Sequence, residues 1–194
     1  MAFSSITQRT VTQALATHAA VKSIDFTGSN VFGQWLIENA RQAQVYAELA
    51  GVNNIVIDST DAYKAMLGNL AFTLSLFSGQ MCTTTQVILV PAGGIATDDG
   101  HKTYEQVCAD LGAAIDRFLS KPEVAFAVLG AIQSGDTADR IALANGGQLG
   151  KVVLASKPLA NPDFPAAKVQ TPVLLACDMA DEAAERADVL GRLE

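Results

Sequence analysis

Two side chains in this sequence have the types needed for covalent acyl chemistry. Cys82 ends the segment 77–82 (FSGQMC), which follows a long apolar stretch and contains a glycine break. Glu48 stands earlier, at the end of an apolar stretch that is typical of a strand. A thiol can be acylated as a nucleophile, and a carboxylate can activate the water that releases the acyl group. The pair predicts an acyl-transfer site if the fold brings the two residues together.

Both residues also have a simpler interpretation. At a strand end Glu48 should lose solvation, which favours the neutral carboxyl and suits a general base near neutral pH. The simpler interpretation of Glu48 is a carboxylate at the rim of the sheet that faces water. After the break at Gly79, the amides of Cys82 and Thr83 should be free to stabilise a thiolate or an oxyanion. The alternative is an inert buried thiol, which is what we expect of Cys108 and Cys177.

A third candidate site lies at a turn between a strand and a helix. Gly28 and Ser29 precede an expected helix, and amides at a helix N-terminus attract anions, so this turn could face a phosphate. Gly33 would let the helix approach the strand closely. The alternative is an ordinary turn in which Ser29 only caps the helix.

The elements that must position these residues alternate along the chain. We expect helices at 8–20, 30–43, 60–77, 102–119, 124–130, 137–145 and from 181, and strands at 23–26, 45–49, 54–57, 85–90, 151–155 and 172–176. This alternation predicts an α/β fold, a three-layer α/β/α arrangement with a mainly parallel sheet. Ser59 or Thr60 should cap the helix that ends at Ser78-Gly79, and that helix is apolar nearly all round, which predicts burial.

Composition excludes several classes of function. The 194 residues carry a net charge of −7, which argues against nucleic acid as a partner. The longest apolar run, 124–132, is too short to span a membrane. Three cysteines and no signal peptide indicate free thiols in a reducing, cytoplasmic context. Neither the cysteine spacing nor the two histidines favours a metal site or a Cys–His pair.

Three segments in order resemble motifs of the aldehyde dehydrogenase superfamily. Residues 26–29 (FTGS), 48–51 (ELAG) and 79–82 (GQMC) are similar to its F-T-G-S, E-L-G-G and G-Q-x-C motifs. The flanking residues 48–58 (ELAGVNNIVID) and 78–85 (SGQMCTTT) look most like the phenylacetic acid degradation branch of the superfamily, called PaaN.

The resemblance implies a mechanism in which an aldehyde is oxidised to a carboxylic acid. Cys82 would attack the aldehyde, hydride would leave to NAD or NADP, and Glu48 would activate water to hydrolyse the thioacyl intermediate. Gly28 and Ser29 would lie beside the cofactor, with the backbone around Leu49 near its nicotinamide. The branch implies a small-molecule aldehyde from aromatic degradation, such as a CoA-linked semialdehyde, and the superfamily implies a homo-oligomer.

The chain also departs from the family pattern. Ala50 replaces a glycine, and Phe77 stands where the family usually has Asn. Family members are much longer, so we expect residues 1–47 to be the C-terminal remnant of a dinucleotide-binding domain and residues 48–194 to be a truncated catalytic, thiol-bearing domain. The isolated chain should bind NAD(P)+ weakly or not at all and be inactive. Two alternatives remain: a non-catalytic α/β binding or assembly module, and a cysteine acyltransferase or thioesterase that needs no nicotinamide.

Overall fold

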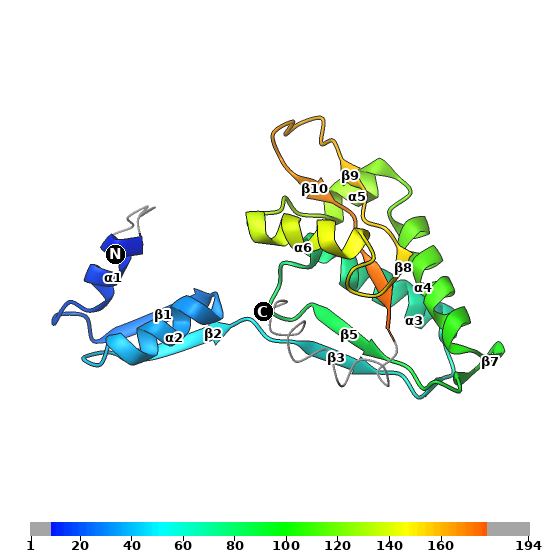
Figure 1. Ribbon diagram of the computed structural model, residues 1–194, viewed down its shortest axis with the longest axis horizontal. Helices are drawn as coiled ribbons and strands as arrows, with labels where there is room; N and C mark the ends of the chain where they lie inside the picture. Colours follow the sequence, from blue (N-terminus) through cyan, green and yellow to red (C-terminus); the bar gives the residue numbers. More distant parts are fainter. Residues whose placement is uncertain (1–8, 178–194) are drawn as a thin grey trace. The chain divides into compact units, whose positions relative to one another are not determined.

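The computed structural model describes residues 9–177 and divides the chain into two compact units. The first unit ends at Gly51 and the second begins at Val52. Figure 1 shows the helices and strands of both. The expected helix from residue 181 lies outside the described residues.

The first unit is a strand–helix–strand motif preceded by a short helix. Its elements are α1 (Arg9–Ala16), β1 (Ser23–Gly28), α2 (Asn30–Asn39) and β2 (Gln44–Leu49). β1 and β2 pair in parallel, with Ser23 opposite Gln44 and Gly28 opposite Leu49. Side chains alternate across a strand, so Ile24 and Phe26 point to the face that α2 covers. The Phe26 ring meets Phe32 of α2 edge-on, at 5.4 Å between centroids.

The second unit contains the remaining elements. Its helices are α3 (Tyr63–Ser75), the 3₁₀ turn η1 (Leu76–Gly79), α4 (Tyr104–Phe118), α5 (Pro122–Val128) and α6 (Gly135–Asn145). Its strands are β3 (Asn53–Val56), β4 (Ser59–Thr60), β5 (Thr85–Leu89), β6 (Ile95–Thr97), β7 (Gly100–Lys102), β8 (Lys151–Leu154), β9 (Pro158–Leu159), β10 (Val169–Gln170) and β11 (Leu174–Ala176).

The two longest strand pairs, β1–β2 and β3–β5, are parallel, and so is the short pair β4–β6. The short pairs β6–β7, β8–β11 and β9–β10 are antiparallel. The predicted α/β class with mainly parallel pairing is therefore confirmed, although the described strands form separate small sheets.

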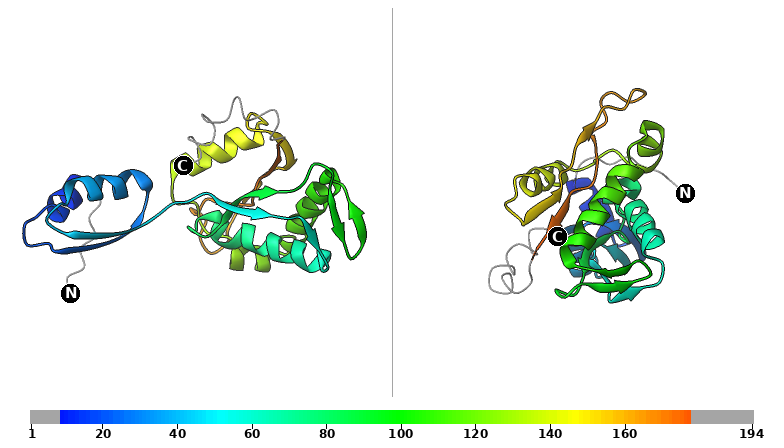
Figure 2. Two further views of the ribbon diagram at one scale, coloured as in Figure 1. Left: turned by 90° about the horizontal axis from the view of Figure 1, so that it is seen from below. Right: turned by 90° about the vertical axis from the view of Figure 1, so that its right-hand side faces the viewer.

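The core of the second unit forms where α3 and α4 pack on one another, side by side in both views of Figure 2. Thr103 begins α4 with a capping box, in which its side chain and that of Gln106 each accept from the other's backbone amide. The largest fully buried apolar side chains of this core are Ile95 and Ile115. Within residues 9–177 none of the helices has the length and apolar character that a membrane crossing requires.

Two predictions about α3 are wrong. Ser59 and Thr60 do not cap it, because they form the short strand β4, and Asp98 instead accepts the Tyr63 amide at 2.8 Å from 35 residues away. The helix is also not buried all round, since Phe72 remains 43% exposed. Within the described chain, α3 therefore has more apolar side chains than its packing against α4 covers.

Candidate active site

The predicted cofactor residues and Glu48 come together at one edge of the first unit. In the parallel ladder, Thr27 lies opposite Glu48 and Gly28 opposite Leu49. Gly28, Ser29, Glu48 and Leu49 therefore share the carboxyl ends of two adjacent strands. This edge is where ligands bind in open α/β sheets.

Ser29 begins α2 as its N-cap. Its hydroxyl accepts a hydrogen bond from the Phe32 amide at 3.4 Å, and its carbonyl accepts from the Gly33 amide at 3.0 Å. The first amides of the helix still lack intrahelical acceptors, as at any helix start. The side-chain oxygen of Asn30, in the first turn of the helix, is buried and has no partner in the described chain. A carboxamide oxygen only accepts hydrogen bonds, so a donor such as a hydroxyl would satisfy it.

Two glycines in the first unit are required by close packing. A Cβ on Gly33 would lie 2.2 Å from Cδ2 of Leu49, so the predicted close approach of α2 to its strand is confirmed. A Cβ on Gly28 would lie 2.6 Å from the Phe26 ring. Both glycines therefore have structural reasons that hold with or without a ligand.

The prediction that Glu48 loses its solvation is wrong for the described chain, because its side chain is exposed. The residues of β2 alternate between the face covered by α2 and the opposite face. Glu48 falls on the opposite face with Tyr46, which is 59% exposed. No described element of the first unit covers that face.

Cys82 belongs to the second unit and lies on a turn before β5. The Thr84 amide closes the turn by donating to the Met81 carbonyl at 3.0 Å. The thiol is exposed, unlike the half-buried Cys108 and Cys177. In the part of the chain that the structure describes, neither the Cys82 nor the Thr83 amide donates to a protein acceptor, as the sequence predicted. Both amides can therefore donate hydrogen bonds to a negatively charged group at this turn.

The backbone leading into this turn is left-handed over three residues in a row. The φ angles are 51° at Phe77, 55° at Ser78 and 73° at Gly79. The predicted left-handed stop at Ser78-Gly79 is confirmed, but it begins one residue earlier. An aromatic side chain rarely adopts this conformation, whereas Asn does so more readily. Backbone strain of this kind is often found at functional sites.

Side-chain hydrogen bonds hold the strained segment against residues 130–133. Gln80 donates to the carbonyls of Phe77 (3.0 Å) and Ala131 (2.9 Å) and accepts from the Gln133 amide (3.0 Å). The Ser78 hydroxyl donates to the Gly130 carbonyl at 2.8 Å. These bonds satisfy backbone groups that the irregular segment leaves without ladder partners.

We call residues 77–84 the thiol loop. Its other side is held by Asn53, which the sequence interpretation missed. The Asn53 side-chain amide donates to the carbonyls of Cys82 at 2.6 Å and Thr84 at 3.0 Å. The only signal in the sequence was a carboxamide two residues after the 48–51 motif, and nothing local connects it with residues about thirty positions away.

The other two cysteines have environments that disfavour reaction. Burial raises the pKa of the Cys108 thiol, with a smaller opposing effect from its hydrogen bond with Tyr104. The Cys177 thiol donates to the Leu149 carbonyl at 3.6 Å. Their predicted packing roles agree with this partial burial. Among the described residues no cluster of His, Cys, Asp and Glu is arranged to hold a metal ion.

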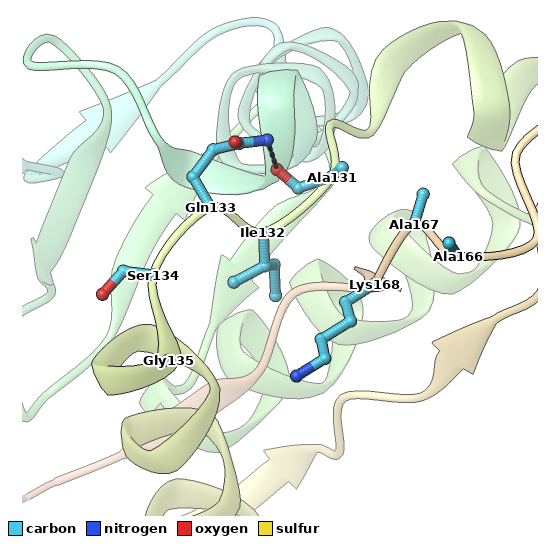
Figure 3. A pocket seen from close by; sticks show the side chains of 8 residues that line it. All are labelled: Ala131, Ile132, Gln133, Ser134, Gly135, Ala166, Ala167 and Lys168. Carbon is cyan, nitrogen blue, oxygen red and sulfur yellow. Dashed lines mark hydrogen bonds between the residues drawn. The ribbon is translucent and has the colours of Figure 1, made fainter. Parts of the chain in front are cut away.

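A pocket of about 370 Å³ lies behind the segment that Gln80 anchors. Figure 3 shows its two sides, residues 131–135 and 166–168, with the Gln133 side chain bonded to the Ala131 carbonyl. None of the predicted site residues lines it. The chemistry predicted from the sequence therefore does not coincide with this pocket.

The fold and its sites define an α/β protein with an exposed cysteine on an anchored turn and a helix N-terminus suited to an anion. Residues 2–150, more than half of the chain, match the model of the aldehyde dehydrogenase family. The chain belongs to the aldehyde dehydrogenase family. A search of curated proteins found no match.

Solved structures of the same fold are similar to this chain. An NAD-dependent aldehyde dehydrogenase from Burkholderia multivorans is 46% identical over 90% of this chain, with a TM-score of 0.82. A variant of aldehyde dehydrogenase C from Pseudomonas syringae, solved with NAD+ and octanal, is 19% identical over 89% of this chain, with a TM-score of 0.61. A Staphylococcus aureus betaine aldehyde dehydrogenase, solved with NAD+, is 16% identical over 88%, with a TM-score of 0.62.

The chain spans only about a third of the length of these relatives. It covers 31% of the Burkholderia protein, 39% of the Pseudomonas protein and 34% of the Staphylococcus protein. Glu48 and Cys82 lie in different units of this chain. The catalytic partnership of these two residues therefore belongs to the proposal that follows.

Proposed function

We propose that this chain supplies the thiol and the carboxylate of an NAD(P)-dependent aldehyde dehydrogenase. The observation that carries the proposal is the exposed Cys82 on its turn, with the Cys82 and Thr83 amides free of acceptors in the described chain. An exposed thiol can reach a substrate as a nucleophile, and free amides beside it can stabilise the oxyanion that its attack creates. Membership of the aldehyde dehydrogenase family supports the reaction class.

The Cys82 sulfur forms a bond to the aldehyde carbon, and the carbonyl oxygen becomes an oxyanion near the two free amides. Loss of hydride from that carbon converts the adduct to a thioester on Cys82. Glu48 accepts a proton from water, which attacks the thioester, so that the carboxylic acid leaves and the thiol is regenerated.

A nicotinamide dinucleotide, when bound, accepts the hydride. The residues that would hold it are Gly28 and Ser29 at the start of α2, with Leu49 beside them. The α2 N-terminus fits a phosphate, and the unpartnered Asn30 oxygen fits a hydrogen-bond donor of the ligand, such as a hydroxyl. The Burkholderia relative, at 46% identity, is NAD-dependent by its description, which supports NAD for this chain.

The finer assignments rest on the motifs at 48–58 and 78–85. We propose a place for the whole protein in phenylacetate or aromatic degradation, in the PaaN branch, acting on an aldehyde such as a CoA-linked semialdehyde. We also propose a cytoplasmic homo-oligomer. The domain division at residues 47/48 belongs to the same proposal, and the division of the structure after Gly51 falls close to it.

Thiol labelling of the chain itself tests the nucleophile. Iodoacetamide should alkylate Cys82 at least ~10-fold faster than Cys108 at neutral pH, because the first thiol is exposed and burial raises the pKa of the second. Peptide mass spectrometry resolves the three sites. Equal and slow alkylation of all three would favour a non-catalytic module.

A chimaera tests the reaction. This chain replaces the matching segment of the Burkholderia protein, and reduced cofactor is followed at 340 nm with an aldehyde substrate. Cys82→Ala should abolish reduction, whereas Glu48→Gln should leave a burst of about one equivalent followed by slow turnover, because only deacylation needs the base. Release of acyl groups from thioesters without any cofactor requirement would favour an acyltransferase or thioesterase. The isolated chain should bind NAD(P)+ weakly and show no sustained turnover.

A further inference from the structure

Asn53 stands at an irregular end of the β3–β5 ladder. Asn53 lies opposite Thr85, but Asn54 lies opposite Val87, so Gln86 is an extra residue on β5. The Gln86 side chain returns to accept the Asn53 backbone amide at 2.7 Å. The Asn53 backbone is thus fixed by β3 and by Gln86, which leaves its side chain to bond elsewhere.

Both bonds from the Asn53 side chain go to the thiol loop. Its Nδ2 atom donates to the carbonyls of Cys82 (2.6 Å) and Thr84 (3.0 Å). It therefore uses both amide protons, one on the Cys82–Thr83 peptide group and one on the Thr84–Thr85 peptide group. Neither serine nor ionised aspartate can reproduce this pattern, since one has a single donor and the other has none.

These bonds determine which way the Cys82–Thr83 peptide points. A trans peptide is planar, and its N–H is directed opposite to its C=O. No described peptide bond is cis. With the Cys82 carbonyl held toward Asn53, the Thr83 amide is directed away from it, and it donates to no acceptor in the described chain.

We propose that Asn53 is a positioning residue for the reaction. By holding the Cys82 and Thr84 carbonyls, it keeps the Thr83 amide free to stabilise negative charge on the Cys82 sulfur or on an oxyanion bound there. This rests on the proposed nucleophilic role of Cys82. Asn53 acts through the loop backbone and does not itself touch the reacting atoms.

The test compares alkylation of Cys82 in the full chain and in three variants. Asn53→Ala removes both bonds, Asn53→Leu keeps a similar branched size without donors or added charge, and Asn54→Ala is a matched control on the exposed neighbouring residue. Iodoacetamide rates are measured for each cysteine from pH 6 to 10, with circular dichroism as the check on folding. If Asn53→Ala does not fold, the uncharged Asn53→Leu carries the comparison.

Loss of the Asn53 donors should slow alkylation of Cys82 about three- to tenfold at neutral pH, in the range expected for one lost hydrogen bond to a charged group. It should also move the pH profile of Cys82 to higher pH. Cys108 and Cys177 should change less than about twofold, and Asn54→Ala should match the parent chain. Added mobility alone cannot produce this result, because Cys82 is already exposed.

The opposite results overturn the proposal. If Asn53 only supports the fold, its variants will melt earlier and all three cysteines will react faster, with the Cys82 profile unmoved. Unchanged rates also reject it. The alkylation rates need neither aldehyde nor cofactor. An inactive chimaera would therefore reject the proposed function, and the effect of Asn53 on Cys82 would still be measured independently.

Discussion

The two candidate sites of this chain are built by different means. At the edge of the first unit, Gly28, Ser29, Glu48 and Leu49 are placed by a regular parallel ladder and by the cap of one helix. The thiol loop has three left-handed residues and is held by side chains that reach across the sequence to backbone carbonyls. The first site depends on the packing of regular elements. The second depends on side-chain hydrogen bonds that offset the unfavourable left-handed conformation of its backbone.

This difference determines what each site tolerates. A regular ladder spreads its stability over many backbone bonds, so a single side chain matters there mainly through its volume. The thiol loop concentrates its order in a few side-chain bonds, so the identity of each donor matters. Substitutions that change volume should therefore affect the first unit most, and substitutions that change backbone preference or donors should affect the loop.

The largest effect should come from Gly33→Ala in the first unit. Alanine favours a helix by about 1 kcal/mol over glycine, but its Cβ would lie 2.2 Å from Leu49 and force repacking that costs about 1–3 kcal/mol. We expect a net loss of up to about 2 kcal/mol in the free energy of unfolding. Trp35, the only tryptophan of the chain, lies in α2 and reports urea unfolding of this unit by fluorescence.

Gly68→Ala is the matched control, because Gly68 is also inside a helix but has open space around it. It should stabilise by up to about 1 kcal/mol, measured by circular dichroism. The double variant Gly33→Ala with Leu49→Ala should be less destabilised than the sum of the single changes. If Gly33→Ala stabilised the chain as Gly68→Ala does, the close approach of α2 to β2 would be refuted.

The regular site was largely predictable from the sequence because its determinants are local. Short apolar stretches indicated β1 and β2, and the Gly-Ser turn indicated the start of α2 at Asn30. Even the role of Gly33 followed from its place in a helix next to a strand. The exposure of Glu48 did not follow, because alternation says which residues share a face and not whether another element covers that face.

The thiol loop was predictable only in part because its determinants lie far apart in the sequence. The break at Gly79 indicated a left-handed stop, but the left-handed Phe77 contradicts the residue's own preference. Asp98 replaces the expected local cap of α3 across 35 residues. Asn53 reaches the Cys82 carbonyl across 29 residues. No local pattern encodes such contacts, so the sequence indicated Cys82 as the candidate nucleophile but not the groups that hold its loop.

A smaller effect should follow from relieving the strain at Phe77. Its left-handed backbone costs about 1–2 kcal/mol for most residues, whereas Asn tolerates it better. Phe77 is 53% exposed, so replacing the ring also loses some burial, and Phe77→Ala measures that loss. Phe77→Asn should be more stable than Phe77→Ala by about 1 kcal/mol in urea unfolding followed by circular dichroism.

The same pair of substitutions at Phe164 gives the control. Phe164 is 67% exposed and has no left-handed backbone, so Asn and Ala should be equivalent there within about 0.5 kcal/mol. An equal Asn–Ala difference at both positions would mean that the strain at residue 77 contributes nothing to stability. Helix preference cannot confuse the result, because neither residue lies in an α-helix.

The smallest effect should be an alkaline loss of stability in the second unit. Burial raises the pKa of Tyr104 to about 12, and burial and the hydrogen bond to Asp110 raise the pKa of Tyr63 further. Tyrosine ordinarily has a pKa of about 10, so above that pH the unfolded chain releases phenol protons that the folded chain retains. Stability from these groups is therefore complete below about pH 10 and falls as pH rises toward 12.

Urea midpoints measured at pH 9, 10 and 11 should decline less steeply in Tyr104→Phe than in the parent chain, because phenylalanine has no proton to release. The slope should be shallow, since Tyr104 is only half-buried and solvent screens its charge. Tyr46→Phe, on the exposed face of β2, should leave the decline unchanged. If Tyr46→Phe and Tyr104→Phe flattened the curve equally, the alkaline effect would come from net charge, and burial in the second unit would have no part in it.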